Sequence, residues 1–421
     1  MEASRQAQFF LACCEHINQT TRVSMAAVKI QRGEQLVEYS ARSQSVRSFK
    51  AMEMMASARM LEEQGRSIIH LEVGQPDFFA PNAVSDRAKS IIESNLTGYS
   101  NAEGLPELRE SIAGFYENRF GLAIDPRRVI VTAGASGALA LLLPLLTDPG
   151  QGWLLPDPGY PSYRHFVSAF GCDAQVLPVY AAHHFQPTAN QIQEAWRSNT
   201  KACLLATPSN PAGTCIQSDV VGEIAKVVST KRGHLIVDEI YQGVSSEGVP
   251  LPTMLSKTDD AFIVNSFSKY FGMTGWRLGW LIVPDQAVDS LIRIAQNLFI
   301  CPSVVAQAAA VAAFHEEAIE EADRRSIDLA QKRRLMSEGL KALGFRIPAN
   351  PDGAFYLFAE VPEGAPDAEA FCEQALQRVG VAMTPGIDFG DNDTKRFVRI
   401  SCAQPTSALL DALQRLRGLA P

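Results

Sequence analysis

The sequence has no long apolar segment. No apolar run approaches the roughly 18 residues that a transmembrane helix requires. The stretch FFLACC, residues 9–14, is short, has only Arg5 ahead of it, and ends at Glu15, so it does not have the form of a secretory signal. We therefore expect a cytoplasmic protein that does not bind membranes.

Disulfide patterns, metal-ligand patterns and basic patches are also scarce. The eight cysteines include no CxxC pair, and the seven histidines form no HExxH pattern. This argues for reduced thiols and against both a disulfide framework and a metal site. The formal net charge is −8 and the pI is about 5.5, so nothing indicates a nucleic-acid partner.

What the sequence does have is a regular alternation of short apolar runs and amphipathic helices from about residue 70 onward. This alternation is typical of an α/β fold with a mostly parallel sheet. Each run is almost continuously apolar, as expected for strands that are covered on both faces. Helices are predicted at 48–64 and 106–121, and strands at 128–133, 152–156, 202–208, 234–239, 261–266 and 278–283.

The pattern changes after about residue 302. A long helical pattern at 306–344 is followed by the short strands GAFYLFAEV and FVRISCA, an order typical of an α+β domain. We therefore predict an N-terminal extension over residues 1–36, a large domain over 76–302, and a smaller α+β domain formed by 37–75 and 303–421.

Chemically distinctive residues follow the predicted strands. The first strand is followed by the Gly-rich turn GASGAL, and the later strands by Tyr160, Asn210, Asp238 and Lys269. Each of these alone has a plainer explanation, such as a tight turn, an Asn-Pro turn or a solvated lysine. Ligands of open α/β sheets, however, bind where the strands end, so we expect these five features to meet.

Together the five features match the needs of pyridoxal 5′-phosphate. A phosphate binds at a helix N-terminus, and the pyridine ring stacks on an aromatic residue. The ring oxygen accepts from an amide, and an aldehyde reacts with a lysine. Asp238 ends an apolar run and needs a partner there, because unpaired burial costs several kcal/mol. A protonated pyridine nitrogen, an arginine or a helix N-terminus would each supply that partner.

Over residues 40–415, approximately, the sequence resembles the class I and II pyridoxal-phosphate-dependent aminotransferases of fold type I. That resemblance implies a large domain with a mostly parallel seven-stranded sheet and a smaller α+β domain. The segment SFSKYFGMTGWRLGW is similar to the family's lysine signature. By that similarity Lys269 bonds the cofactor aldehyde, and the phosphate is bound by Ser266, Ser268, Arg277 and the backbone of Ala135 and Ser136.

The resemblance implies further roles. Tyr160 would stack on the ring, Asp238 would pair with the ring nitrogen, and Asn210 and Tyr241 would hydrogen-bond the ring oxygen. Arg399, in FVRIS, would bind the substrate α-carboxylate with help from Asn210 and the backbone of Gly74. Tyr99, in TGYSNAEGLPELR, would reach the phosphate of a neighbouring subunit, which implies a homodimer.

The implied activity is transfer of the amino group of an L-amino acid to a 2-oxo acid, in a ping-pong cycle between the aldehyde and amine forms of the cofactor. Aspartate-specific members carry a lysine in the turn VT-x-G-x-K, where this chain has Ser136. A hydroxyl does not balance a second carboxylate, so neutral or aromatic amino acids are favoured over aspartate. Arg47 is a basic residue that would rescue acidic substrates if it folded over the site.

Two alternatives were weighed, and one of them, a lyase, stays open at this point. The same lysine and fold serve lyases, such as C–S β-lyases or aminocyclopropane carboxylate synthase-like enzymes, and the active-site motifs barely discriminate. Transcription regulators fuse a winged-helix domain to an aminotransferase-like domain. The roughly 40 residues ahead of the shared region here are not a basic helix-turn-helix module, so we set that alternative aside.

Overall fold

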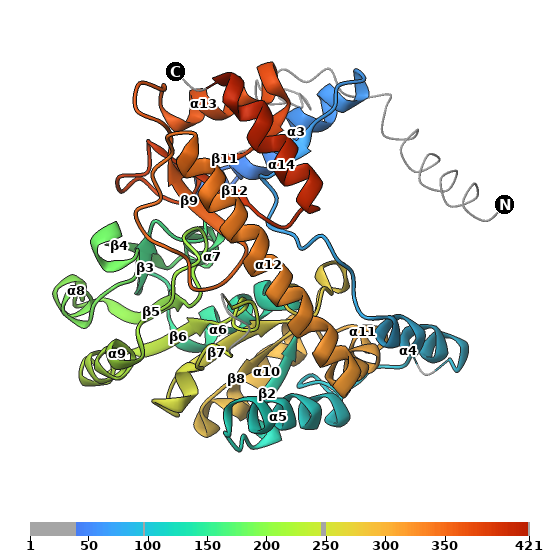
Figure 1. The fold of residues 1–421 in the computed structure, drawn as a ribbon. Coiled ribbons are helices and arrows are strands. Elements are labelled where there is room, and N and C mark those ends of the chain that lie inside the picture. Colours follow the sequence, from blue (N-terminus) through green and yellow to red (C-terminus); the bar gives the residue numbers. More distant parts are fainter. Residues whose placement is uncertain (1–38, 96, 246–249, 420–421) are drawn as a thin grey trace, which may run out of the picture. The chain divides into compact units, whose positions relative to one another are not determined.

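The structure is a computed structural model that describes residues 39–95, 97–245 and 250–419 (Figure 1). The chain divides into two units, residues 1–44 and residues 45–421. The described part of the first unit contains the start of a short helix, α2 (Ala41–Ser45). The predicted N-terminal extension, residues 1–36, lies outside the described residues, and all elements below belong to the second unit.

A seven-stranded sheet is the centre of this unit, with the strand order β2-β8-β7-β6-β5-β3-β4 (Figure 1). β8 runs antiparallel to both of its neighbours, and the other pairings are parallel. The predicted mostly parallel α/β fold is therefore confirmed. The strands are β2 (Val129–Thr132), β3 (Gly152–Asp157), β4 (Asp173–Pro178), β5 (Thr200–Ala206), β6 (His234–Asp238), β7 (Phe262–Ser266) and β8 (Gly279–Ile282).

Six of the strands coincide with the predicted apolar runs. Every residue of β2, β7 and β8 is buried, as the continuous apolar pattern requires. β4 was not predicted, because it lies at the edge of the sheet and its residues differ in burial, with Val176 exposed between buried Gln175 and Leu177. An edge strand of this kind gives no continuous apolar run.

Helices cover both faces of the sheet, and neighbouring residues of one strand pack on opposite sides. In β2, Ile130 packs in the cluster that contains residues of α6, α7 and α10, whereas Val129 and Val131 pack in the cluster that contains residues of α4, α5, α8, α9 and α11. These helices are α4 (Asn82–Glu93), α5 (Pro106–Phe120), α6 (Gly134–Leu146), α7 (Ser162–Ala169), α8 (Ala189–Ala195), α9 (Ser218–Thr230), α10 (Val288–Leu298) and α11 (Val304–Ala310).

A second group of elements is built from residues near the start and near the end of this unit. β1 (Ile69–His70) pairs in parallel with β10 (Val381–Ala382). β12 (Phe397–Ser401) lies between β11 (Thr384–Pro385) and β9 (Tyr356–Glu360), antiparallel to both. The helices of this group are α3 (Lys50–Glu63), α12 (Glu316–Ala342), α13 (Ala368–Gln374) and α14 (Thr406–Leu416).

The predicted division into a large domain (76–302) and a small domain (37–75 with 303–421) stays a prediction. In its favour, Ile69 and Leu71 share one core cluster with Leu357 and Leu409. Against a sharp boundary, α12 contributes to two clusters. Its first half packs with the sheet through Ala322 and Leu329, and its second half packs with the C-terminal strands through Met336 and Leu340.

The helix predicted over 306–344 is interrupted. α11 ends at Ala310, a 3₁₀ turn follows (Val311–Phe314), and α12 begins at Glu316. His315 between them has extended backbone angles, φ −64° and ψ 146°, which break the helical ladder. No helix in the part of the chain that the structure describes is both long and apolar enough to span a membrane.

Candidate active site

One cavity brings together twelve of the residues selected from the sequence. Its lining includes residues from the ends of the sheet strands and from the C-terminal strands. The twelve are Gly74, Ala135, Ser136, Tyr160, Asn210, Asp238, Tyr241, Ser266, Ser268, Lys269, Arg277 and Arg399.

Tyr99 is the predicted site residue that does not line this cavity. Its side chain is 85% exposed, ahead of α5. Its predicted contact with a neighbouring subunit stays a prediction.

The sheet topology explains why distant residues meet. β5, β6 and β7 run parallel and in register, with Ala206 opposite Asp238 and Asp238 opposite Val264. Their carboxyl ends therefore reach one edge of the sheet. β8 runs the other way and begins at Gly279 opposite Ser266, so Arg277 reaches the same edge by preceding its strand.

Lys269 lies deep in this cavity. Its Nζ donates to the backbone oxygen of Gly74 at 2.5 Å. Burial, followed by the nearby charges of Arg399 and Arg277, lowers the pKa of Lys269 to about 8, although Asp238 opposes this shift. Part of the amine is therefore neutral near neutral pH, which a nucleophile or a general base requires.

Asp238 is held by two donors. Its Oδ2 accepts from the Tyr163 hydroxyl at 2.6 Å, and its Oδ1 accepts from the amide of Ile240 at 3.0 Å. Burial raises the pKa of Asp238 above its ordinary value, while the two hydrogen bonds and Lys269 lower it. Tyr163 was not selected from the sequence, although it stands three residues after Tyr160 and contacts it edge to face, with 5.2 Å between the ring centres.

An anion could be held where α6 begins. Gly134 opens α6 with a φ of +69°, and a Cβ atom there would lie 2.8 Å from Nη2 of Arg277. The amides of Ala135 and Ser136 lie in the first turn, where the helix dipole favours negative charge. Nearby, the Ser266 hydroxyl donates to the Ser268 hydroxyl at 2.9 Å.

Arg399 extends from β12 into the opposite wall of the cavity. Its guanidinium carbon lies 4.6 Å from the ring centre of Tyr356 and 4.9 Å from that of Phe389. Nη1 donates to Asn210 Oδ1 at 3.1 Å, and Nη2 donates to the Glu72 backbone oxygen at 2.5 Å. Nε is buried and has no partner among the described residues. Asn210 takes one of the two N–H groups of Nη1, which leaves the other as a donor for a carboxylate.

Tyr356 of β9 is a second cavity residue that was not selected from the sequence. Its hydroxyl lies 2.7 Å from that of Tyr241. A Cβ atom on Gly74 would lie 2.2 Å from the Tyr356 hydroxyl oxygen, so the close approach of these two segments requires glycine. The only sequence signal was the run GAFYLFAEV, which predicts a strand but no partner.

The rest of the cavity lining is largely apolar. It includes Phe49, Met52, Val73, Leu139 and Ile240, none of which was selected from the sequence. In this described lining, the cationic side chains are those of Lys269, Arg277 and Arg399.

Arg47 lines a neighbouring cavity with Arg164 and His165. It is not part of the lining around Lys269 in the described structure. The two cavities share Tyr160 and Tyr163.

The chain is similar in sequence and in structure to known aminotransferases. The family model described as aminotransferase class I and II matches residues 66–416. The chain is 39% identical over 374 residues to the valine–pyruvate aminotransferase of Mycobacterium tuberculosis, a match that covers 89% of this chain and 96% of that protein. It is 30% identical over 384 residues to the aspartate/prephenate aminotransferase of Thermus thermophilus, covering 89% and 97%. The solved structure of an aminotransferase from Mycobacterium tuberculosis superposes with a TM-score of 0.88 at 37% identity, covering 91% and 99%.

Proposed function

The chain belongs to the class I and II aminotransferases, which are enzymes that use pyridoxal 5′-phosphate, and on that premise we propose that it transfers the amino group of a neutral L-amino acid to a 2-oxo acid by a ping-pong mechanism. The observation that carries this proposal is the cavity itself. It joins a partly buried amine of lowered pKa, Lys269, to a buried carboxylate, Asp238, and to an arginine with a free donor, Arg399.

The residues present fit the cofactor. Arg277, Ser266, Ser268 and the first turn of α6 offer donors for a phosphate, and Gly134 leaves the backbone there open to close approach. Asp238 would hold the pyridine nitrogen, Tyr160 would stack on the ring, and Asn210 and Tyr241 would donate to its oxygen. When bound, the cofactor supplies an aldehyde that takes up the amino group and a ring that withdraws electrons.

Lys269 is the proposed nucleophile and general base. Its lowered pKa leaves part of the amine free to accept the substrate's α-proton near neutral pH. Gly74 accepts a hydrogen bond from Nζ and so fixes where the amine points. Asp238 stays oriented because Tyr163 and the Ile240 amide hold both of its oxygens.

Arg399 is the proposed binding residue for the substrate α-carboxylate. The rings of Tyr356 and Phe389 fix the guanidinium plane, and Asn210 and Glu72 each take one of the N–H groups at its outer nitrogens. A carboxylate held at the second N–H of Nη1 is oriented for proton removal at the adjacent carbon.

The substrate side chain is proposed to be neutral and aliphatic, as in valine, with pyruvate as an acceptor. The lining offers Phe49, Met52, Val73 and Leu139 to such a side chain, and Ser136 stands where a lysine would meet a second carboxylate. The naming of one relative as a valine–pyruvate aminotransferase supports this choice. Another relative is named an aspartate/prephenate aminotransferase, so the proposed preference for a neutral side chain needs a direct test.

The test is a half-reaction screen on the purified enzyme with its cofactor bound. Each amino acid is added alone, and conversion of the cofactor is followed by absorbance. We expect valine or another neutral amino acid to have a specificity constant about tenfold or more above that of aspartate, since an unpaired charge in the pocket is costly. A preference for aspartate over every neutral donor would refute the proposed specificity.

The variant Ser136→Lys sharpens this test. A cation at that position should raise the specificity constant for aspartate and lower that for valine. Ser90→Lys, on the exposed side of α4, is the matched control and should change neither.

We also propose that the enzyme is a cytoplasmic homodimer in which Tyr99 of one subunit approaches the phosphate site of the other. Support comes from the exposed Tyr99 and from further exposed apolar residues, including Phe79, Leu298 and Ile300. The six described cysteines are all free thiols, which agrees with a reducing compartment.

A further inference from the structure

The backbone of residues 72–74 holds both of the basic side chains on which the proposed chemistry depends. The Glu72 oxygen accepts from Arg399 Nη2 at 2.5 Å and from the Thr384 hydroxyl at 3.0 Å. Two residues later, the Gly74 oxygen accepts from Lys269 Nζ at 2.5 Å. Whatever fixes this short stretch therefore fixes the positions of Arg399 and Lys269 as well.

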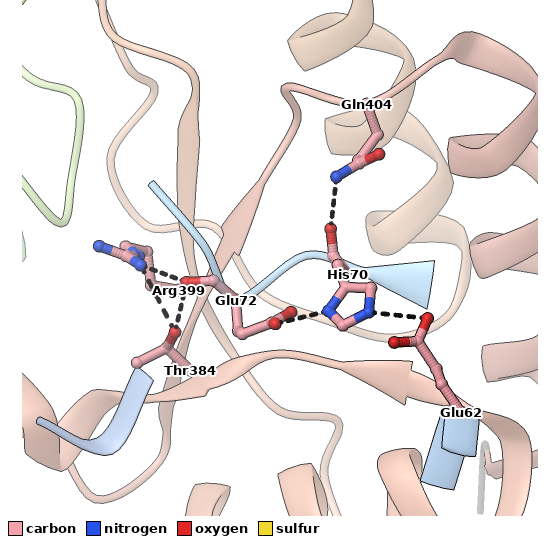
Figure 2. Close-up of polar contacts among 6 residues, drawn as sticks. All are labelled: Glu62, His70, Glu72, Thr384, Arg399 and Gln404. Carbon is pink, nitrogen blue, oxygen red and sulfur yellow. Dashed lines mark hydrogen bonds and ion pairs between the residues drawn. The ribbon is translucent and has the colours of Figure 1, made fainter. Parts of the chain in front are cut away.

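The residues just before it are anchored to neighbouring strands. The amide of Leu71 donates to Ala382 at 2.9 Å, and the amide of Ser401 donates to Leu71 at 2.8 Å. The backbone oxygen of His70 accepts from Gln404 at 2.9 Å (Figure 2). The side chain of Glu72 is a further anchor of this stretch. It points away from Arg399 and toward His70, as Figure 2 shows.

Glu72 is a fully buried acid with a single partner among the described side chains. One carboxylate oxygen lies 2.7 Å from His70 Nδ1, and the other is buried without a partner in the described structure. A buried carboxylate left without a cation costs several kcal/mol, so the position of Glu72 depends on His70.

His70 is suited to this task. It lies in β1 two residues from Glu72, a spacing that places both side chains on one face of an extended segment. Its Nε2 lies 3.2 Å from Glu62 of α3 (Figure 2). The hydrogen bond to Glu72, opposed by partial burial and aided by Glu62, raises the pKa of His70 to about 9, so the imidazolium donates to both acids at neutral pH.

We propose that His70 is a positioning residue, which pairs with the buried carboxylate of Glu72 and thereby holds the backbone carbonyls of residues 72–74 where they orient Arg399 and Lys269. The inference rests on the proposed function of those two residues. By this inference, the ion pair of His70 and Glu72, which lies outside the cavity, sets how tightly the substrate carboxylate is bound.

The experiment compares His70→Leu, His70→Gln, Glu72→Gln and the double variant His70→Leu/Glu72→Gln in the enzyme with its cofactor bound. The first measurement is the dissociation constant of isovalerate, a branched carboxylate that cannot react because it has no amino group. The second is the separation of KM from kcat for the amino acid that the half-reaction screen selects. Thermal unfolding of each variant reports whether it has folded.

We expect His70→Leu to weaken isovalerate binding and to raise KM by about tenfold, with a smaller change in kcat, because Arg399 loses its alignment. His70→Gln keeps a donor for Glu72 and should have a smaller effect. Glu72→Gln removes the charge that needs His70, so His70→Leu should change isovalerate binding little in that background. The rescued double variant also keeps the test decisive if His70→Leu alone does not fold.

His234→Leu is the matched control, since His234 is also half-buried but begins β6, at the end of the strand away from the cavity. It should leave isovalerate binding and KM unchanged. Unchanged binding in His70→Leu, or an equal loss in both Glu72 backgrounds, would overturn the inference.

Arg399→Lys separates this inference from the proposed function. If Arg399→Lys weakens isovalerate binding and the His70 variants do not, only the role of His70 is wrong. If Arg399→Lys has no effect, the carboxylate-binding role of Arg399 is wrong, and the inference fails with it.

Discussion

The two walls of the cavity are assembled in different ways. One wall consists of residues at the carboxyl edge of a single sheet, among them Asp238, the last residue of β6, and Lys269, which follows β7. The other wall is made by Phe49, Val73, Gly74, Tyr356 and Arg399, which come from separate parts of the chain. The first wall carries the proposed cofactor chemistry, and the second carries the proposed substrate contacts.

This difference predicts how variants should behave. Changes in the sheet wall should affect the reaction of every substrate, because every substrate uses the same cofactor. Changes in the other wall should alter affinity and preference among substrates.

Lys269→Ala should have the largest effect. It removes both the proposed nucleophile and the proposed base, so transamination should fall by roughly 10⁴-fold or more for all substrates. Cofactor should still bind weakly through the phosphate contacts, with a changed absorption spectrum. Lys226→Ala, at an exposed position of α9, is the control. Wild-type turnover in pure Lys269→Ala would contradict the assignment.

Asp238→Asn should have the next largest effect. Its kcat should fall by roughly a hundredfold or more, while the variant folds nearly as the wild type does. The substitution is close to isosteric but no longer stabilises a protonated ring nitrogen. Glu239→Gln is a sharp control because Glu239 is the adjacent buried acid and accepts from Thr253 and the Met254 amide instead of facing the cavity. Equal losses of activity in the two variants would show that Asp238 is a structural acid.

Tyr99→Phe should have a smaller effect, about tenfold weaker retention of the cofactor, since it removes one hydrogen bond to a charged group. The effect should be seen by dialysis followed by absorbance, while light scattering should show an unchanged dimer. Tyr180→Phe, another exposed tyrosine, should retain cofactor normally. A fully active monomer would rule out the shared site.

The smallest expected effect is on the pH dependence of stability. Burial raises the pKa of Glu239 to about 8. Because the pKa of Glu239 is higher in the folded state, its contribution to the free energy of unfolding is fully present below about pH 4.5. That contribution is lost as the pH rises through 8. Between pH 5 and 8 the melting temperature of the wild type should therefore fall by a few degrees more than that of Glu239→Gln. Parallel melting curves across this range would contradict the assignment.

The contrast between the walls also explains what could be predicted from the sequence. Lys269 and Asp238 could be found because each follows a continuous apolar run, and the order of strand ends in an open sheet gives the edge at which they meet. The edge strand β4 could not be found, because its exposed residues break the apolar pattern. The interruption at His315 was missed because both flanking segments have helical periodicity.

The second wall was harder to predict. Arg399 was selected through a family motif, but Phe49 and Tyr356 were not selected. Their contacts depend on pairings between segments far apart in the chain, such as that of β9 with β12. No local pattern in one sequence records such pairings. The pairing of His70 with Glu72 is different: the two-residue spacing was visible, but the burial of Glu72 was not.

The reversed direction of β8 has a consequence for insertions and deletions. Lys269 and Arg277 lie in one connection between neighbouring antiparallel strands, and the register of Ser266 opposite Gly279 fixes both ends of it. A residue added or removed within this connection would shift one of these side chains relative to the other. The connection from β6 to β7 begins at the cavity with Ile240 and Tyr241, but its later described residues do not line the cavity, because it passes to the opposite edge of the sheet before β7 begins. Natural length variation should therefore concentrate at that opposite edge, whereas the segment between β7 and β8 should keep its length.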